Sequence, residues 1–416
     1  MGDKQIEVAI IGAGPAGLAA ALSAIDSRAS EVYLFERHQE LGGILPQCIH
    51  NGFGLRYFKE ELTGPEYAAR FIKLVKNNPR IKLKTGTMVV ELTPDLKLTT
   101  LGSAEGIATY RAKAVILAMG CRERPRGAIN IPGTRPAGIF TAGTIQRMIN
   151  IEGYVPGRRA VILGSGDIGL IMARRLTLEE IKVEAVLELM PYSAGLTRNI
   201  VQCLDDFEIP LLLNHTVTRI YGGKRIEGVE ASLVDENRAP IREKAFKIDC
   251  DTLVLSVGLI PENELSAMAG VKLHQTTGGP ETDSLCRTSV PGIFACGNVL
   301  HVHDLVDDVS NEAKNAGKAA AEYAGGKNQS PPTCRIILGR NIKSVTPQLI
   351  CPDTETTLYI RVVSPQREVR LKVGGQMIKE KVVTPGETIR FTLKPEVIPD
   401  QGELLVSIEP GGEPYA

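Results

Sequence analysis

Residues 8–25 read VAIIGAGPAGLAAALSAI, and this stretch decides the fold. A short apolar strand runs into Gly12, Gly14 and Gly17, and a segment of helical length follows. In a dinucleotide-binding turn the first glycine permits the tight bend, the second admits a pyrophosphate, and the third lets the helix pack on the strand. The free amides at the start of the helix then face the phosphates. We therefore predict a nucleotide-binding βαβ unit here and no membrane span, because glycines and Pro15 interrupt the apolar run.

The pattern occurs a second time in residues 160–170, which read AVILGSGDIGL. Gly164, Gly166 and Gly169 have the spacing of the first copy, and a strand precedes them as before. Glycines that serve only helix packing in a nucleotide-free α/β fold are the alternative reading. Two copies in the same context nevertheless favour two dinucleotide sites.

A glutamate follows each copy after a second apolar strand, Glu36 in the first and Glu188 in the second. An acid at this spacing accepts hydrogen bonds from the ribose hydroxyls of the nucleotide. Because a carboxylate suits a free 2′-hydroxyl and repels a 2′-phosphate, Glu188 favours NAD(H) over NADP(H). Arg198, which lies downstream, works against that preference.

Composition excludes several classes of function. The chain has 416 residues, and its 48 basic and 48 acidic side chains cancel, so no net charge draws it onto nucleic acid. It has no Trp, and aromatic residues make up 5%, which also argues against stacking on single strands. Eight cysteines without a C-x-x-C pair argue against a disulfide framework and fit a reducing compartment. The charged start lacks a signal peptide, so we expect a cytoplasmic protein.

Further strands organise the rest of the chain. The runs 114–120 (AVILAMG) and 251–258 (DTLVLSVG) resemble last strands that close the two nucleotide-binding units. A helix is expected from Asp308 to Gly325. From Thr356 onward the pattern alternates with period two between turn signals, which predicts an antiparallel β-sandwich of fewer than about ninety residues.

The order of these motifs is recognisable. GAGPAG with Glu36, LAMG (117–120), GSGDIG with Glu188 and PGIFACGN (291–298) resemble the thioredoxin-reductase-like pyridine nucleotide oxidoreductases, flavoproteins with two dinucleotide-binding domains. The phrases GGILPQCIHNGFGL and CGNVLHVHDLVDDVSNEA are similar to the flavoprotein that accompanies anaerobic glycerol-3-phosphate dehydrogenases. The resemblance covers residues 5–325.

The resemblance implies an α/β architecture of two Rossmann-like domains. A split FAD-binding domain would comprise residues 1–125 and 263–330, with an NAD(P)-binding domain, 126–262, inserted in it. Residues 333–416 would form a small C-terminal all-β domain that serves docking or oligomerisation.

The resemblance also assigns site residues. FAD would be held by residues of the first turn and of the segments that meet it: Gly12, Gly14, Pro15, Ala16, Gly17, Glu36, Gly43, Ala118, Gly120, Gly297, Asn298 and Val309. The nicotinamide nucleotide would be held by Gly164, Gly166, Asp167, Gly169, Glu188 and Gly258.

Three features depart from the family pattern. Asn298 stands where an Asp is usual, so it can bind a hydroxyl but brings no charge. Asp167 lies at the start of the phosphate-facing helix, where its carboxylate would cap amides that a pyrophosphate uses. Without a C-x-x-C pair there is no attacking and resolving thiol, so we predict that this is no thioredoxin reductase.

We therefore predict an FAD-dependent oxidoreductase that transfers a hydride between NAD(H) and FAD. Because no disulfide relay is present, the electrons must be exchanged with something outside this chain. By resemblance, a dehydrogenase partner subunit of the glycerol-3-phosphate type is the first candidate, and a homo-oligomer is a further expectation. Two alternatives remain: an assembly subunit whose nucleotide sites are structural, and a flavin dehydrogenase that oxidises an amine or polyol directly.

Several single residues carry weaker hypotheses. Cys48 and His50 are candidates for a redox-active thiolate and imidazolium pair, although a buried thiol and a loop histidine are more common. His301, His303 and Asp304 have spacing that suits a metal, but the sequence indicates no further ligand nearby, so we expect no metal. The arginines at 122, 124 and 126 either neutralise phosphates or mark a solvated crossover.

Overall fold

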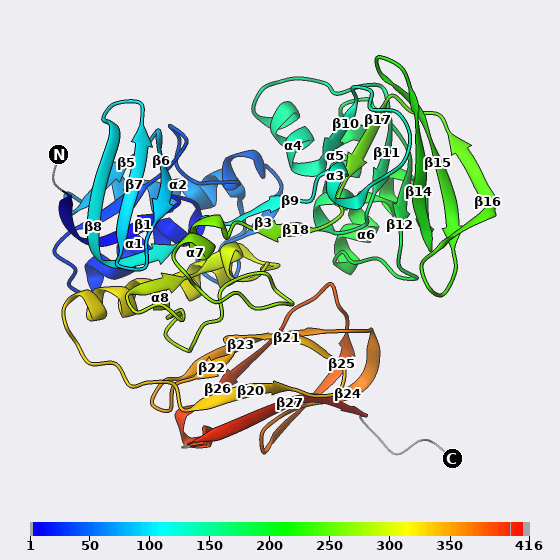
Figure 1. Ribbon diagram of the computed structural model, residues 1–416. Coiled ribbons are helices and arrows are strands. Elements are labelled where there is room, and N and C mark those ends of the chain that lie inside the picture. The colour runs from blue at the N-terminus through cyan, green and yellow to red at the C-terminus, as the bar shows by residue number, and fades with distance from the viewer. Residues whose placement is uncertain (1–2, 400, 411–416) are drawn as a thin grey trace. The chain divides into compact units, whose positions relative to one another are not determined.

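The computed structural model describes residues 3–399 and 401–410 (Figure 1). Contacts divide the chain into two compact units. The first combines Met1–Cys121 with Pro261–Ala416, and the second is Arg122–Ile260. The chain enters the second unit in β9 (Cys121–Glu123) and returns in β18 (Leu259–Pro261).

A seven-stranded sheet organises the first unit in the order β5-β2-β1-β8-β7-β6, with β19 also paired to β8. Its parallel strands are β1 (Lys4–Ile11), β2 (Val32–Phe35), β5 (Ile81–Lys84), β8 (Gly106–Leu117) and β19 (Ile293–Ala295). The antiparallel strands β6 (Thr87–Leu92) and β7 (Lys97–Gly102) extend it as a meander.

Alternation along the second half of β1 explains why residues Val8–Ile11 are all apolar. Val8 and Ile10 belong to the core under α1 and α8, whereas Ala9 and Ile11 belong to a second core on the other face. A strand covered on both faces needs no polar side.

Three helices complete this part: α1 (Pro15–Asp26), α2 (Gly64–Lys76) and α8 (Val306–Ala324). The expected helix thus begins two residues earlier than Asp308. Alanines fill the interface between α1 and α8. At Gly317 a Cβ would lie 2.3 Å from the carbonyl oxygen of Ala20, so the backbones approach closely. Thr63 and Glu66 form a capping box at the start of α2.

The second unit contains a parallel sheet in the order β10-β17-β11-β12-β13. Its strands are β10 (Ile139–Thr141), β11 (Arg159–Leu163), β12 (Lys182–Glu188), β13 (Leu211–Leu213) and β17 (Thr252–Leu255). Its helices are α3 (Arg126–Ile129), α4 (Ala142–Asn150), α5 (Asp167–Leu178) and α6 (Thr197–Cys203). A separate sheet is a meander of β14 (His215–Gly222), β15 (Ile226–Val234) and β16 (Pro240–Ile248). Its buried apolar side chains share one core with those of the parallel sheet.

The C-terminal strands form two sheets around one apolar core. One has the order β22-β20-β27-β24-β25, and the other is β21-β23-β26. Their bounds are β20 (Cys334–Leu338), β21 (Ile342–Thr346), β22 (Leu349–Ile350), β23 (Thr356–Val362), β24 (Gln366–Val373), β25 (Gln376–Val383), β26 (Ile389–Leu393) and β27 (Gly402–Pro410).

The prediction of a purely antiparallel sandwich is wrong in one respect. β20 and β27 pair in parallel, with Cys334 opposite Gly402. β20 precedes the period-two region, so the sequence pattern indicated no strand there. Two parallel neighbours need a long crossover connection between them. Here the strands from β21 to β26 form that connection between β20 and β27.

The remaining elements are short. They are β3 (Asn51–Phe53), β4 (Leu62–Thr63), α7 (Glu264–Met268) and the 3₁₀ turns Leu45–Gln47, Asp205–Phe207, Gly297–Val299 and Pro395–Val397.

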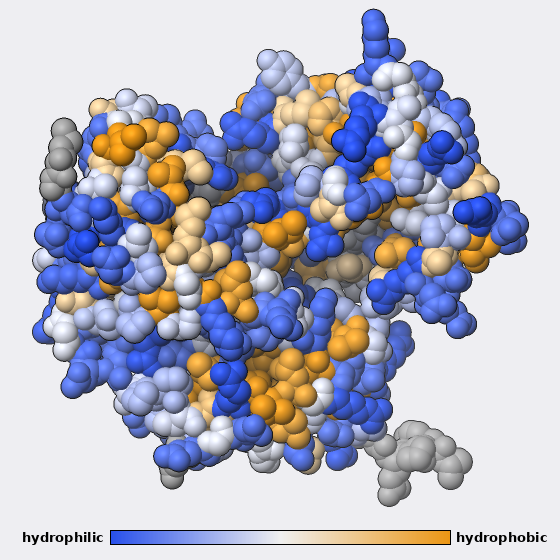
Figure 2. Space-filling view, viewed as in Figure 1, coloured by the Kyte–Doolittle hydropathy of each residue, from blue (hydrophilic) through white to orange (hydrophobic). Residues whose placement is uncertain are grey.

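The surface is mostly hydrophilic, with separate apolar areas (Figure 2). One such area lies over the β6-β7-β8 meander, where Met88, Leu101 and Ile107 are exposed. Within the described residues, none of the helices combines the length and apolar character needed to cross a membrane.

Candidate dinucleotide-binding sites

The first turn joins β1 to α1 through Gly12, whose φ of 102° favours glycine. A Cβ on Gly12 would lie 2.4 Å from the carbonyl oxygen of Ala118, and one on Gly17 would lie 1.8 Å from that of Gly12. Gly14 is the N-cap of α1, Pro15 follows it at the first helical position, and no side chain caps the helix. The first amides of α1 are therefore not bound by a side-chain cap, as an anion site requires.

Glu36 ends β2 and is 6% exposed. Its Oε2 accepts a hydrogen bond from the Ala13 amide and its Oε1 one from the His38 amide, both at 2.9 Å. A carboxylate offers about four lone-pair directions, so each oxygen keeps one for a ribose hydroxyl.

Other segments of the first unit close around this turn. A Cβ on Gly43 would lie 2.9 Å from Gly14 Cα, so the loop after β2 touches the turn. A Cβ on Gly297 would lie 2.8 Å from the Cβ of Ala16 and 3.4 Å from Val309 in α8. The structure thus assembles residues that are up to about three hundred positions apart in sequence, whereas the region above Gly120 stays open.

A cavity of about 450 Å³ lies beside the loop that follows Glu36. Gln39, Glu40 and Leu41 line it together with Leu83 and Thr85 at the end of β5. These residues were missed in the sequence, because the loop has no motif and β5 is distant in the chain.

The second turn repeats this construction in the second unit. Gly164 has a φ of 103°, and a Cβ there would lie 2.0 Å from the carbonyl oxygen of Ser256. A Cβ on Gly169 would lie 2.4 Å from the oxygen of Gly164. Gly166 is the N-cap of α5, and space is open above Gly258.

Glu188 ends β12 and is 7% exposed. Its Oε2 accepts from both the amide, at 2.9 Å, and the hydroxyl, at 2.6 Å, of Ser165. Its Oε1 accepts from the Met190 amide at 2.9 Å. This carboxylate therefore keeps one lone-pair direction, on Oε1, where Glu36 keeps two.

Asp167 does not cap α5, contrary to the expectation from sequence. Its Oδ1 instead accepts from the Leu196 amide at 2.8 Å and from Asn199 Nδ2 at 2.7 Å. The carboxylate binds the start of α6, where Leu196 is the N-cap and Asn199 lies in the first turn, and these two donors satisfy it. The amides of α5 are thus not taken by this side chain.

Asn298 is held within the first unit by its own loop. Its Oδ1 accepts from the His303 amide at 3.0 Å and lies 3.3 Å from His303 Nδ1, while its Nδ2 lies 3.6 Å from Cys121 Sγ. An aspartate at this position would meet the same donors. The amide thus serves to fix residues 298–303.

Cys48 and His50 lie in the loop between the 3₁₀ turn Leu45–Gln47 and β3. Burial raises the pKa of the Cys48 thiol to about 12, so the thiol is protonated at neutral pH. Its Sγ lies 3.4 Å from the carbonyl oxygen of Ile44, and His50 Nδ1 lies 3.0 Å from that of Asn51. This environment favours a packed thiol over a thiolate.

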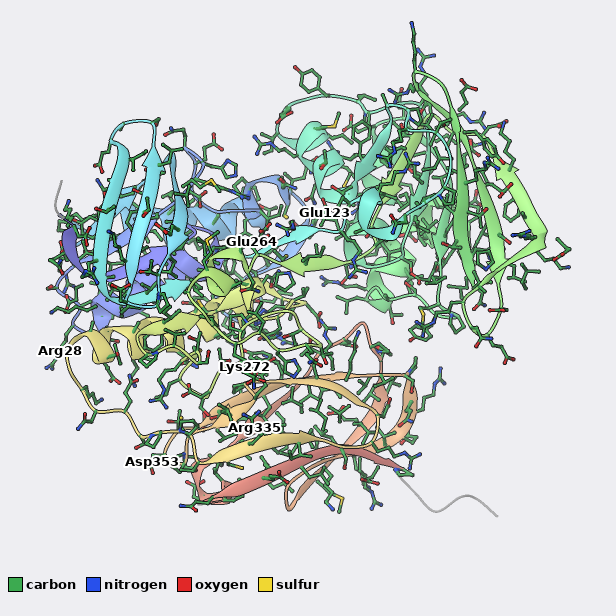
Figure 3. The ribbon with its side chains drawn as sticks, in the orientation of Figure 1. Arg28, Glu123, Glu264, Lys272, Arg335 and Asp353 are labelled. Carbon is green, nitrogen blue, oxygen red and sulfur yellow. The ribbon has the colours of Figure 1, made fainter. Side chains whose placement is uncertain are left out.

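Residues at the start of the second unit have structural contacts. Glu123, labelled in Figure 3, accepts a hydrogen bond from the Gly143 amide at the start of α4, at 2.7 Å. Arg126 donates to the carbonyl oxygen of Ile131 at 3.1 Å, and burial lowers its pKa. For Arg126 the structural reading of the arginine cluster is therefore favoured.

His301 and His303 meet a partner that the sequence pattern did not indicate. Asp304 points away from them and pairs with Arg361 of β23. Glu312, one turn and a half into α8, comes within 3.2 Å of His301 Nε2 and 3.4 Å of His303 Nε2. Burial acts to raise the pKa of the Glu312 carboxyl, but the two imidazoles outweigh burial and hold that pKa well below its usual range. The only sequence signal was a glutamate in an otherwise Ala-rich buried helix face.

Comparison with known proteins matches residues 6–320 to the pyridine nucleotide-disulphide oxidoreductases. An opine oxidase subunit of Agrobacterium tumefaciens is 25% identical over 411 residues, which cover 94% of this chain and 75% of that protein. Thioredoxin reductase of Listeria monocytogenes is 28% identical over 305 residues, covering 71% of this chain and 86% of the reductase. The crystal structure of T. acidophilum thioredoxin reductase aligns with a TM-score of 0.63 at 25% identity, over 77% of this chain and 99% of that one.

Proposed function

Because this chain belongs to the pyridine nucleotide-disulphide oxidoreductase family, whose members are FAD-dependent enzymes, we propose that it transfers a hydride between NAD(H) and FAD and exchanges the electrons with a partner subunit. The observation that carries this proposal is the duplicated turn, in which two uncapped helix starts each lie beside a buried glutamate.

The first site fits the ADP part of FAD. The start of α1 has no side-chain cap and no acid in its first turn, so it suits a pyrophosphate. Glu36 keeps a lone pair on each oxygen for the two ribose hydroxyls. Gly14 and Gly43 lie against each other, and a Cβ on Gly43 would lie 2.9 Å from Gly14 Cα.

The second site fits an exchangeable nicotinamide nucleotide. α5 also starts without a side-chain cap, and Gly166 forms its N-cap. The carboxylate of Glu188 supports a preference for NAD(H), since it would repel a 2′-phosphate. Arg198 is exposed at the start of α6 and does not bind Glu188 in the described hydrogen bonds.

In this mechanism the chain's own residues bind and orient the two nucleotides. Bound FAD supplies the two-electron redox chemistry. Glu36 and Glu188 accept hydrogen bonds from ribose hydroxyls, and the amides of α1 and α5 bind the phosphates. Hydride transfer needs no side-chain acid or base, which agrees with a protonated Cys48 thiol.

The electrons leave to an acceptor outside the chain in this proposal. The sequence has no C-x-x-C, and none of its eight cysteines forms a disulfide within the described residues. The opine oxidase relative is by its name one subunit of a larger enzyme, which supports a dehydrogenase partner. By the resemblance of its motifs, a glycerol-3-phosphate dehydrogenase-like subunit is the first candidate.

Anaerobic mixing of the purified full chain with NADH tests the proposal. We expect the flavin absorbance at about 450 nm to fall, which is a general property of flavin reduction. A flavin that is bound but not reduced by NADH or NADPH would contradict hydride transfer and favour an assembly subunit. Bleaching by an amine or polyol without nucleotide would instead identify a direct dehydrogenase.

A further inference from the structure

Three potential metal ligands converge outside the nucleotide turns, at the start of α8. His301, His303 and Glu312 each offer one ligand atom, and these atoms lie within 4.8 Å of one another. Their side chains are at most 9% exposed. Buried ionisable groups that meet in this way need either protons or a bound cation to balance them.

The hydrogen bonds of Asn298 fix the tautomer of His303. The backbone amide of His303 is an unambiguous donor, so the Asn298 atom that accepts from it at 3.0 Å must be the oxygen. The same oxygen lies 3.3 Å from His303 Nδ1, which must therefore carry a hydrogen. A neutral His303 ring then has an unprotonated Nε2, which presents its lone pair to the cluster.

That nitrogen has no hydrogen-bond partner. His303 Nε2 is buried and lies 3.4 Å from Glu312 Oε2, without the geometry of a hydrogen bond. Two buried acceptor atoms this close repel each other unless a proton or a metal ion balances them. Ligands of metal ions in proteins are usually oriented by hydrogen bonds to their other polar atoms. His303 has such a contact from its Nδ1 to Asn298, and Glu312 has one because its Oε1 accepts from the Gly297 amide at 2.6 Å.

The spacing of the ligand atoms suits a small divalent ion. Nitrogen and oxygen atoms bound tetrahedrally at about 2.0–2.2 Å from zinc lie roughly 3.3–3.6 Å apart. Glu312 Oε2 lies 3.2 Å from His301 Nε2 and 3.4 Å from His303 Nε2. Thus the carboxylate oxygen is already at the required separation from both imidazoles.

A cavity adjoins Glu312 and leaves room for a water ligand. Its volume is about 60 Å³, and its polar lining residues include Glu312, Asn311 and Asn315 of α8 and Thr356 and Tyr359 of β23. A cavity of this size with several polar partners has room for one or more waters. The ring of Tyr359 also covers both imidazoles, at centroid distances of 5.1 and 5.3 Å.

We propose that His301, His303 and Glu312 bind one divalent transition-metal ion, with water from the adjoining cavity as the remaining ligand. Two imidazoles and a carboxylate form a ligand set that suits Zn²⁺ and Fe²⁺. The ion joins the loop of residues 297–303 to α8 beneath Tyr359 of the C-terminal domain. No nucleotide-binding turn supplies a ligand, although Gly297 and Asn298, which orient two of the ligands, also belong to the predicted FAD set.

Metal content and affinity test this site in the full chain. After treatment with a chelator, the protein is titrated calorimetrically with Zn²⁺, and separately with Fe²⁺ under anaerobic conditions. We expect one equivalent of one of these ions to bind, and Glu312→Gln and His303→Gln to weaken that binding more than about a hundredfold. Asn298→Ala, which removes the orienting acceptor, should weaken it about 10–100-fold. The matched control His274→Gln, at a partly buried histidine elsewhere in the first unit, should retain it.

X-ray absorption on the unmutated, zinc-loaded chain covers the case in which variants do not fold. We expect scattering from imidazole rings and from nitrogen or oxygen ligands, with no sulfur at the roughly 2.3 Å typical of Zn–S. Zinc bound by cysteine sulfur would overturn the proposal, as would a full chain that binds neither ion at micromolar concentrations.

Discussion

The two dinucleotide turns share one backbone and differ in what surrounds it. Gly12 donates to the carbonyl oxygen of Phe35 at 2.8 Å, and Gly164 donates to that of Leu187 at 2.7 Å. The neighbouring strands β8 and β17 also match: the amide that follows each of them donates to the carbonyl oxygen of the last residue of β1 or β11, respectively. Since the backbone bonds match, any difference in function must arise from side chains and loops.

The glutamates show where the copies diverge. Glu36 meets only amides, one of them from Ala13, whereas Glu188 also accepts the hydroxyl of Ser165. Glu36 thus keeps two acceptor directions and Glu188 one. The comparison teaches that a single side chain, Ala or Ser, sets how many ribose hydrogen bonds the carboxylate can make. In the proposed function, this difference would suit a retained FAD in the first site and an exchangeable coenzyme in the second.

The third glycines offer the largest test of this comparison. An added Cβ would lie 1.8 Å from a backbone oxygen at Gly17 but 2.4 Å at Gly169. We expect Gly17→Ala to destabilise the protein by roughly 3 kcal/mol, the upper part of the overpacking range, and to abolish flavin retention. Gly169→Ala should cost less and yield protein that is still yellow. Flavin absorbance and thermal midpoints of both variants measure this, and equal losses would show that the two turns are equally tight.

Charge reversal of the glutamates separates the two roles. Glu188→Arg should shift the NADH to NADPH ratio of kcat/KM about 10–100-fold toward NADPH, because a charged hydrogen bond is worth about 1.5–3 kcal/mol. Glu36→Arg should instead lower the flavin content and leave the nucleotide preference of the remaining holoprotein unchanged. Steady-state kinetics with both coenzymes provides the measurement. Unchanged selectivity in Glu188→Arg would show that this residue does not contact the ribose.

Exchange of the small residues has a more modest effect. Ser165→Ala removes the hydroxyl from Glu188 Oε2 and frees a lone pair, so we expect the KM for NADH to fall about fivefold, equivalent to about 1 kcal/mol. Ala13→Ser is the reciprocal variant, and it should release FAD more readily on dilution. A KM for NADH that rises in Ser165→Ala would mean that the hydroxyl orients the carboxylate more than it occupies it.

Cys48 lies in a loop of the first unit, between the 3₁₀ turn Leu45–Gln47 and β3. Its substitution should have the smallest effect on flavin reduction. The raised pKa, about 12, means that the thiolate appears only as pH approaches that value, so little is present at pH 7–9. Cys48→Ser should reduce its flavin with NADH at a rate within about twofold of the unmutated chain. Stopped-flow bleaching between pH 7 and 9 checks this. A loss of more than tenfold, or a rate that follows a thiol ionisation in this range, would restore the redox-pair hypothesis.

Local patterns predicted the strands and turns of both fingerprints because their physics is local. The strand 32–35 and the turn glycines were placed correctly from periodicity and spacing. The capping role expected for Asp167 was wrong, since Leu196 and Asn199 at the start of α6, about thirty residues away, donate to its carboxylate instead. Likewise Glu312 was overlooked as a neighbour of His301, because a helix face and a loop meet only after folding.

By itself the sequence determined two glycine-rich turns between a strand and a helix, each followed by a glutamate at the end of the next strand, and the absence of a C-x-x-C pair. The turns depend on closely spaced glycines, and each glutamate follows within one βαβ unit, 23 residues from the turn amide that donates to it. Tertiary structure decided which loops surround each turn, that β20 pairs in parallel with β27, and that two histidines face Glu312 beneath Tyr359. Such contacts join distant segments, and their energies depend on burial and on competing partners that no local pattern encodes.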